Sequence, residues 1–361
     1  MEQRQEQKME RKLPLKKVFG VSLDASDDPG SLQLKQAAMM AREISDDVFY
    51  DSPYDTLVEN LPDNHGFDLQ GKFPIPSWLG PRPLPADRPM ITPEHFGSFY
   101  ENKGFLETSR QIKHFVMENI FPETPLMIGI DHSSTGGVLY ALAEQYGAEN
   151  ISVIVLDQHF DAIPPSIRIK AYFQDHGGST TGPSLMPFSD TGSDEYSCGN
   201  FLAHLMEEGT VMPENLLFIG VADYPRNTMN ENWRPFIEAY RDFEQRGCRF
   251  FPQWLFREPY LDKLTHFVSE HIKTPYVYVS LDLDIGAMNC IHAARYMDTP
   301  GISRENLLDI AKVIANNLKE GTFSLIGLDV MEFNTHFLGI NTGDGIEDRT
   351  IDVVKDFILS L

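Results

Sequence analysis

Ionisable side chains recur at every second position in one short stretch of the sequence, directly after a β-branched segment. Residues 153–163 read VIVLDQHFDAI, which places Asp157, His159 and Asp161 at alternate positions. Side chains on an extended strand change face with a period of two, so these three groups start on one side. A lone carboxylate at a strand end more often caps a helix or joins an ion pair. Several such groups together indicate a site that holds a ligand.

Three further apolar segments end in acids or histidine. They are GIDHSS at 129–134, SLDLD at 280–284 and GLDVMEFN at 327–334, and they contribute Asp131, His132, Asp282, Asp284, Asp329 and Glu332. Converging carboxylates repel one another unless cations compensate their charge. Oxygen and nitrogen ligands without thiolate suit Mn²⁺, Fe²⁺, Co²⁺ or Ni²⁺ and disfavour a structural Zn²⁺ site. Carboxylates that bridge favour two ions that share an activated water.

The elements that must position these groups alternate along the chain. Strand patterns such as 151–157 and 276–284 are separated by helical patterns such as 303–321. This alternation predicts an α/β fold, a three-layer αβα sandwich with a central, mainly parallel sheet. Ligands of such sheets bind beyond the carboxyl ends of the strands. All of the acids and histidines described above fall at predicted strand ends of this kind.

The chain is predicted to form one catalytic domain over residues 15–361. Residues 1–14 are polar, with no apolar run, and are predicted to be a disordered N-terminus. Residues 51–93 are rich in proline and glycine and are predicted to be an irregular excursion of the same domain.

Composition restricts the partners and the location. The net charge is −23, from 53 acidic and 30 basic side chains. Nucleic acid is therefore excluded as a partner, because phosphate binding needs clustered Lys and Arg. The acidity either attracts cations or serves solubility alone. No apolar run approaches the roughly 18 residues of a membrane span, so no membrane partner is expected. The three cysteines are widely spaced and odd in number, which favours a reducing cytoplasm.

The four motifs resemble, in order, those of the ureohydrolase superfamily, which contains arginase, agmatinase, guanidinobutyrase and formimidoylglutamase. Those families show Gly-x-Asp-His-Ser, Asp-x-His-x-Asp, Ser-x-Asp-x-Asp and Asp-x-Met-Glu. The resemblance covers residues 15–361, with the motifs in 125–335. It implies an arginase-like fold and two Mn²⁺ per chain, with Ni²⁺, Co²⁺ or Fe²⁺ as alternatives. It also implies a homo-oligomer, either a trimer or a hexamer.

The resemblance also implies roles for single residues. One ion would be bound by His132, Asp157, Asp161 and Asp282, and the second by Asp157, His159, Asp282 and Asp284. In such enzymes a bridging hydroxide attacks the central carbon of a guanidinium or amidine. Asp161 would then relay a proton to the leaving amine, and Glu332 would face the guanidinium. The implied activity is hydrolysis of a small cationic guanidino compound, derived from agmatine, a guanidino acid or arginine, to urea and an amine.

The sequence departs from the family pattern in three places. Ala287 and Met288 stand where the third motif usually continues to Asp-Pro. Cys198 or, by its spacing, His176 takes the place of a family histidine that contacts substrate, and Cys198 is favoured as the positional match. A structural role for this cysteine is the alternative. The third departure lies in two loop sequences, one after Ala162 and the other ADYPRNTMNENW at 222–233. Neither loop sequence supports recognition of free L-arginine.

The loop 222–233 supplies further candidates for substrate contacts. Arg226 and Trp233, together with Tyr224, are predicted to bind the substrate beyond its head group, unless the loop is simply mobile. Two other readings of the whole chain remain open. One is hydrolysis of a formimino or amide C–N bond on the same scaffold. The other is a non-catalytic metal-binding relative, against which the complete set of metal ligands argues.

Overall fold

The computed structural model describes residues 16–26, 28–44, 52–175, 194–226, 229–340 and 347–361. Within these residues, eight parallel strands form one sheet in the order β2-β1-β3-β8-β7-β4-β5-β6. The strands are β1 Lys16–Val21, β2 Asp68–Lys72, β3 Thr124–Gly129, β4 Ile151–Leu156, β5 Leu216–Ile219, β6 Arg249–Phe251, β7 Tyr276–Asp282 and β8 Ser324–Met331. The predicted parallel sheet is thereby confirmed.

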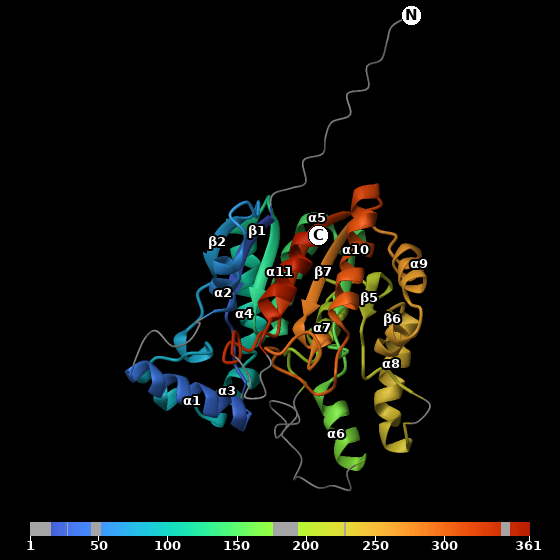
Figure 1. Cartoon of the computed structure of the whole chain (residues 1–361). Helices are drawn as coiled ribbons and strands as arrows, with labels where there is room; N and C mark the ends of the chain where they lie inside the picture. The colour runs from blue at the N-terminus through green and yellow to red at the C-terminus, as the bar shows by residue number, and fades with distance from the viewer. Residues whose placement is uncertain (1–15, 27, 45–51, 176–193, 227–228, 341–346) are drawn as a thin grey trace, which may run out of the picture.

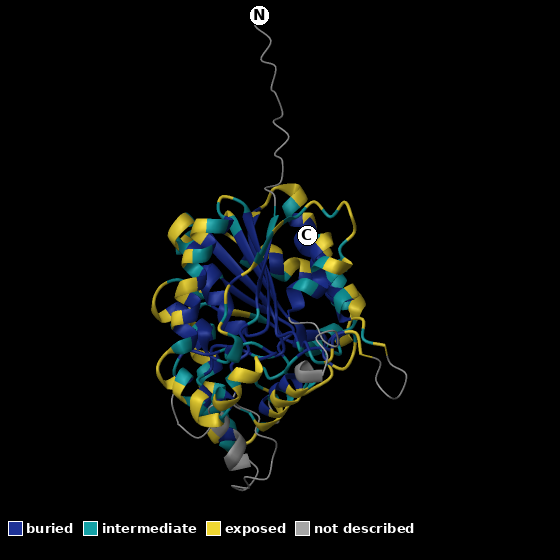
Figure 2. Ribbon diagram, turned by 90° about the vertical axis from the view of Figure 1, so that its left-hand side faces the viewer, coloured by how far each residue is buried: buried dark blue, intermediate teal, exposed yellow. Residues whose placement is uncertain are grey.

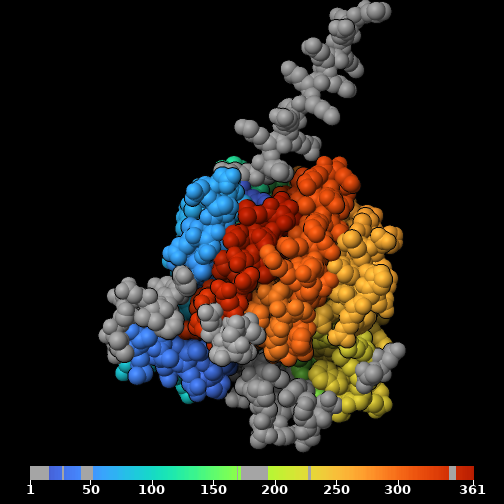
Figure 3. All heavy atoms as spheres, in the orientation of Figure 1, coloured from blue at the N-terminus to red at the C-terminus, as the bar shows by residue number. Residues whose placement is uncertain are grey.

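Helices cover both faces of this sheet, as predicted. One face packs against α4 Gly104–Phe115, α5 Thr135–Tyr146, α7 Phe201–Glu207 and α8 Arg234–Arg246. The other packs against α2 Pro53–Asn60, α9 Leu261–His271, α10 Arg304–Glu320 and α11 Thr350–Ser360. Helices α10 and α11 lie side by side on this second face (Figure 3). Three more helices, α1 Pro29–Ile44, α3 Pro93–Glu101 and α6 Pro165–Asp175, lie toward the carboxyl ends of the strands (Figure 1).

The strands are buried on both faces because their residues are apolar in succession. In β4, Val153 and Val155 belong to the core under α4, α5, α7 and α8, whereas Ile154 and Leu156 belong to the core on the other face. A sheet covered on both sides requires such uninterrupted apolar strands. Figure 2 shows the sheet as a buried layer between helices with exposed outer surfaces.

The segment 51–93 is more regular than predicted. It contains helix α2, whose Ser52 cap accepts a hydrogen bond from the Tyr54 amide, and the edge strand β2, which pairs in parallel with β1. Short 3₁₀ turns follow at Ser77–Leu79 and Pro85–Met90. The prediction of an irregular excursion is therefore wrong for α2 and β2. The short strand DLQGK is half-exposed and polar, so it lacks the apolar alternation that marks a strand in sequence.

Sheet order brings the four motif strands together. They are the consecutive neighbours β3, β8, β7 and β4. Their ends are also level, because Ile128 pairs with Val330, Val330 with Leu281, and Leu281 with Leu156. The residues that follow these four positions therefore meet at one edge of the sheet. Residues 1–14, predicted to be disordered, lie outside the described residues. Within the described chain, no helix is long and apolar enough to cross a membrane.

Candidate metal centre

Four buried groups converge just beyond the ends of β3, β4 and β7. Ligand atoms of His132, Asp157, Asp161 and Asp282 lie within 4.8 Å of one another. His132 Nδ1 is 3.0 Å from Asp161 Oδ2, 3.1 Å from Asp282 Oδ2 and 3.6 Å from Asp157 Oδ2. These are the four residues that the family resemblance implies for one ion.

A second group adjoins the first and shares Asp157 with it. It contains Asp157, His159 and Asp284, and His159 Nδ1 lies 2.7 Å from Asp284 Oδ2. Asp282 is predicted to contact both ions but belongs here only to the first group. Asp157 is thus the residue common to both groups.

The strand ends turn sharply, and the carboxylates themselves stabilise the turns. Asp157 Oδ1 accepts a hydrogen bond from the His159 amide at 2.6 Å, and Asp282 Oδ1 accepts one from the Asp284 amide at 2.9 Å. Such turns end a strand and leave the second carboxylate oxygen available to the cluster, as in Asp282, whose Oδ2 lies 3.1 Å from His132 Nδ1. Asp157 Oδ2 is buried and, within the described residues, has no hydrogen-bond partner.

The electrostatics of the cluster fit divalent cations. Burial, followed by repulsion from Asp282 and Asp284, raises the pKa of Asp157 well above its ordinary value. Burial and the charge of Asp284 raise the pKa of Asp282 to about 7. Carboxylates held so close are stable in the ionised form only if cations compensate them. A donor set of carboxylate oxygens and imidazole nitrogens suits Mn²⁺ and similar ions.

A chain of hydrogen bonds behind His132 fixes its ring. His132 Nε2 lies 2.8 Å from Ser280 Oγ, and Ser280 donates a 2.6 Å hydrogen bond to Asp329 Oδ1. Asp329 also accepts hydrogen bonds from Thr135 and Tyr278. Since the Ser280 proton goes to Asp329, His132 Nε2 donates to Ser280 and Nδ1 faces the cluster.

The protonation of Nδ1 depends on whether a cation is present. Burial lowers the pKa of His132, but hydrogen bonds to Asp161 and Asp282 outweigh it and raise the pKa well above the ordinary value. A bound cation would replace the proton on Nδ1. The sequence placed Asp329 at a strand end, but the supporting roles of Asp329 and Ser280 were not predicted. The motifs contain a signal for both residues. Ser280 is the serine that opens Ser-x-Asp-x-Asp, and Asp329 is the first acid of Asp-x-Met-Glu.

His159 has an outer partner that sequence reasoning also missed. Its Nε2 lies 3.3 Å from Asp298 Oδ2, and this contact is the main cause that lowers the pKa of Asp298. Both nitrogens of His159 therefore face carboxylates. The loop that carries Asp298 is remote in sequence and has no motif that would have indicated the contact.

Glu332 borders the cluster from the end of β8. Its backbone is in the left-handed region, with φ of 64°, which is uncommon for a residue other than glycine and marks a constrained position. Its Oε1 accepts the His132 amide at 2.9 Å. Its Oε2 faces Nε of Arg295 at 3.7 Å. Burial raises the pKa of Glu332 well above its ordinary value.

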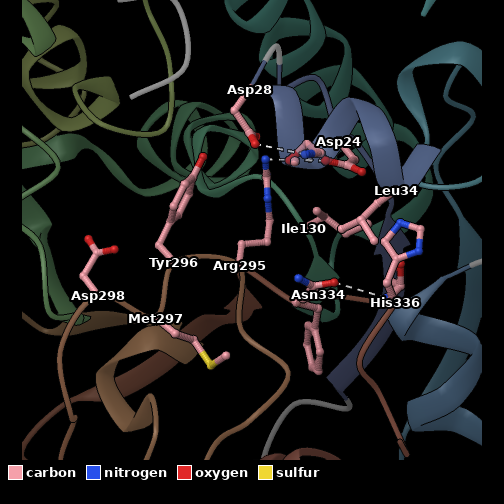
Figure 4. A pocket seen from close by; sticks show the side chains of 14 residues that line it. Asp24, Asp28, Leu34, Ile130, Arg295, Tyr296, Met297, Asp298, Asn334 and His336 are labelled. Carbon is pink, nitrogen blue, oxygen red and sulfur yellow. Dashed lines mark hydrogen bonds and ion pairs between the residues drawn. The ribbon is translucent and has the colours of Figure 1, made fainter. Parts of the chain in front are cut away.

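Arg295 was not anticipated from the sequence. Its side chain is only 8% exposed and lines a pocket together with Asp24, Asp28, Tyr296, Asp298, Asn334 and His336, among others (Figure 4). Because no metal-ligand or catalytic pattern contains it, its position could be found only from the folded chain.

The remaining predicted site residues lie as follows. Cys198 precedes α7 near the cluster, and burial, then the charges of Asp131 and Glu332, raise its thiol pKa well above the ordinary value. A raised pKa favours the protonated thiol, and the catalytic role of Cys198 stays a prediction. His176 lies outside the described residues. The Arg226 guanidinium lies 4.9 Å from the Trp254 ring centre, and Trp233 packs against Phe236. Their substrate contacts stay predictions.

Comparison with known proteins agrees with this fold. The description "Arginase family" belongs to the family model that matches residues 59–352. The chain belongs to the arginase family. Members are hydrolases that act on amidine and guanidino C–N bonds, and they generally use a binuclear metal centre. A search of the curated proteins finds no match.

Solved structures similar to this chain share its fold at low sequence identity. Proclavaminate amidino hydrolase from Streptomyces clavuligerus has a TM-score of 0.55 and 19% identity, over 96% of this chain and 91% of that chain. Arginase from Bacillus caldovelox has a TM-score of 0.55 and 17% identity, over 97% and 98%. Formimidoylglutamase from Bacillus subtilis has a TM-score of 0.55 and 14% identity, over 96% and 85%.

Proposed function

We propose that this arginase-family chain is a binuclear metal-dependent hydrolase of a C–N bond in a small planar nitrogen compound. The observation that carries the proposal is the pair of adjoining ligand groups that both contain the buried Asp157, whose Oδ2 has no hydrogen-bond partner within the described residues. We propose two Mn²⁺ as the native ions, with Ni²⁺, Co²⁺ or Fe²⁺ as alternatives. We also propose that the protein is cytoplasmic and forms a trimer or hexamer.

The chain's own groups suit the steps of such a reaction. His132, Asp157, Asp161 and Asp282 would hold one ion, and His159 and Asp284, with Asp157 and Asp282, the other. When bound, the two ions would supply an activated water for attack on the planar carbon. Asp161 stands at the edge of the cluster, 7% exposed, and would pass a proton to the leaving nitrogen. Burial of the first ligand group keeps bulk water away from its charges, whereas His159 of the second group is partly exposed.

The first candidate substrate is a guanidino compound, which would give urea and an amine. Glu332 supports it, because a buried carboxylate beside the cluster can orient a cationic planar group. The second candidate is a formimino or amide compound. One observation favours this second candidate: Arg295 already lies against the same carboxylate.

The two candidates are separated by their products. Metal-stripped protein is reloaded with Mn²⁺, Ni²⁺ or Co²⁺ and incubated with guanidino compounds and with formimino and amide compounds. Urea identifies the first candidate, whereas formamide or ammonium without urea identifies the second. Asp157→Asn, which should lack the shared ligand, is the control for activity independent of the site. Turnover of neither set with any of the three metals would contradict the proposed function.

A further inference from the structure

The loop that carries Arg295 is fixed against the end of β8. The Arg295 amide donates a 2.9 Å hydrogen bond to the Glu332 carbonyl, and the Asn334 amide donates one of 2.8 Å to the Ala293 carbonyl. Ala294 and Phe333 form an antiparallel bridge between them. The backbone therefore holds the Arg295 side chain beside Glu332.

The guanidinium of Arg295 is surrounded by three carboxylates. Nε lies 3.7 Å from Glu332 Oε2, while the two terminal nitrogens lie 3.6 Å from Asp131 Oδ2 and 3.5 Å from Asp24 Oδ1. Its central carbon lies 5.3 Å from the centre of the Tyr296 ring. Figure 4 shows the side chain extending toward Asp24 with Tyr296 alongside. Arg295 thus places its own guanidinium beside Glu332, the carboxylate that the family resemblance assigns to the guanidinium of a substrate.

Two buried polar atoms at this place lack hydrogen-bond partners within the described residues. They are the Nη1 donor of Arg295 and the Oε2 acceptor of Glu332. A guanidinium offers donors only, so it could pair with Oε2 but would bring a second cation against Arg295. An uncharged amide offers both a carbonyl acceptor and N–H donors. It therefore carries a partner of the right kind for each of the two atoms.

We propose that Arg295 is a specificity-determining residue that makes this site select an uncharged amide-type group, a carboxamide or ureido group, over a guanidinium. The amide oxygen accepts from Arg295 and its N–H donates to Glu332. This inference rests on the proposed function only in placing the substrate at the metal cluster. Removal of Arg295 takes a guanidinium away from Asp24, Asp131 and Glu332, and Lys35 stays 3.0 Å from Asp24. The place that the Arg295 guanidinium leaves between these carboxylates then binds a guanidinium from solution.

Ligand-observed NMR on the full chain tests the preference without any turnover. Acetamide and methylguanidinium are the probes, because each carries one methyl signal, and both are titrated into metal-free and Mn²⁺-loaded protein. The wild type should bind acetamide at least tenfold more tightly than methylguanidinium. Arg295→Ala should gain at least tenfold in methylguanidinium affinity. Arg304→Ala, which removes an exposed arginine of the Asp356 ion pair, should leave the preference unchanged.

A second variant at Arg295 distinguishes the loss of its charge from a defect in folding. Arg295→Gln removes the charge with less loss of volume, and thermal unfolding establishes whether each variant is folded. It too should gain methylguanidinium affinity. Wild type that binds methylguanidinium as tightly as both variants would overturn the role of Arg295. If no compound is turned over but the NMR preference reverses as expected, the proposed function fails while this inference holds.

Discussion

Nδ1 of His132 lies 3.0 Å from Oδ2 of Asp161, although the two residues follow different strands and are separated by 29 positions. The contact joins the end of β3 to the end of β4, which are not neighbours in the sheet. Two further strands lie between them, and Asp282 from one of these strands approaches the same nitrogen. The histidine is therefore the centre of the first ligand group.

Because Asp157 is common to both ligand groups, its replacement should affect both ions. Asp157→Asn is expected to reduce bound Mn²⁺ from about two ions to less than one per chain and to abolish metal-dependent turnover. Asp284→Asn should remove chiefly one ion. Elemental analysis after gel filtration measures the stoichiometry. Asp262→Asn, an exposed surface change, is the control. Unchanged metal content in Asp157→Asn would rule out its shared role.

The hydrogen bonds behind His132 should tune metal affinity. Ser280→Ala leaves His132 Nε2 without its acceptor and is expected to weaken Mn²⁺ binding by about 10- to 100-fold. Competition with a fluorescent chelator gives the dissociation constant. Ser152→Ala is a matched control, because Ser152 is a buried serine on β4 that bonds Thr274 at the opposite end of the sheet. Equal affinities for the two variants would contradict an orienting role.

The metal-free protein should lose stability as the pH rises. Burial raises the pKa of Asp282 to about 7, so between about 4 and 7 the folded state binds more protons than the unfolded state. A rise in pH through this window therefore lowers the free energy of unfolding, by a few kcal/mol at most in order of magnitude. Asp282→Asn should remove this dependence on pH. The free energy of unfolding of the variant, relative to that of the wild type, should therefore increase as the pH rises.

Thermal unfolding in chelator between pH 5 and 8 measures this difference. Saturating Mn²⁺ should remove the effect, because a bound cation holds the carboxylates in their ionised form. A wild type and an Asp282→Asn variant with parallel pH profiles would show that Asp282 is not perturbed in the folded chain.

Phe160 anchors the stretch between His159 and Asp161. Its ring is fully buried and lies within 5.0 Å, centre to centre, of Phe218, Tyr240, Phe243 and Phe250. Phe160→Ala is expected to lower the free energy of unfolding by about 3–5 kcal/mol in urea titration. Phe337→Ala, at a position 43% exposed, should change it little. Similar losses for both variants would contradict the anchoring role.

Alternation of strands and helices was sufficient to predict the layered parallel fold, because runs of apolar residues such as Val153 and Ile154 can be recognised in the sequence alone. The metal-ligand candidates could also be recognised, since Asp157 and Asp282 stand at strand ends within compact motifs. Arg295 and Asp298 were not. They belong to a loop whose position depends on backbone bonds to the end of β8, and no local pattern encodes a contact between such distant segments.

The sheet order has a consequence for the synthesis of the chain. Strand β8 lies between β3 and β7, yet among the strands of the described residues it is the last to be made. A nascent chain that ends before residue 324 carries His132 on one side of a gap and Asp157 and Asp282 on the other. His132 is therefore expected to join the first ligand group only after β8 has been made and fills that gap. Asp157, His159 and Asp284 follow the adjacent strands β4 and β7, so the second group does not depend on β8 and is expected to assemble earlier.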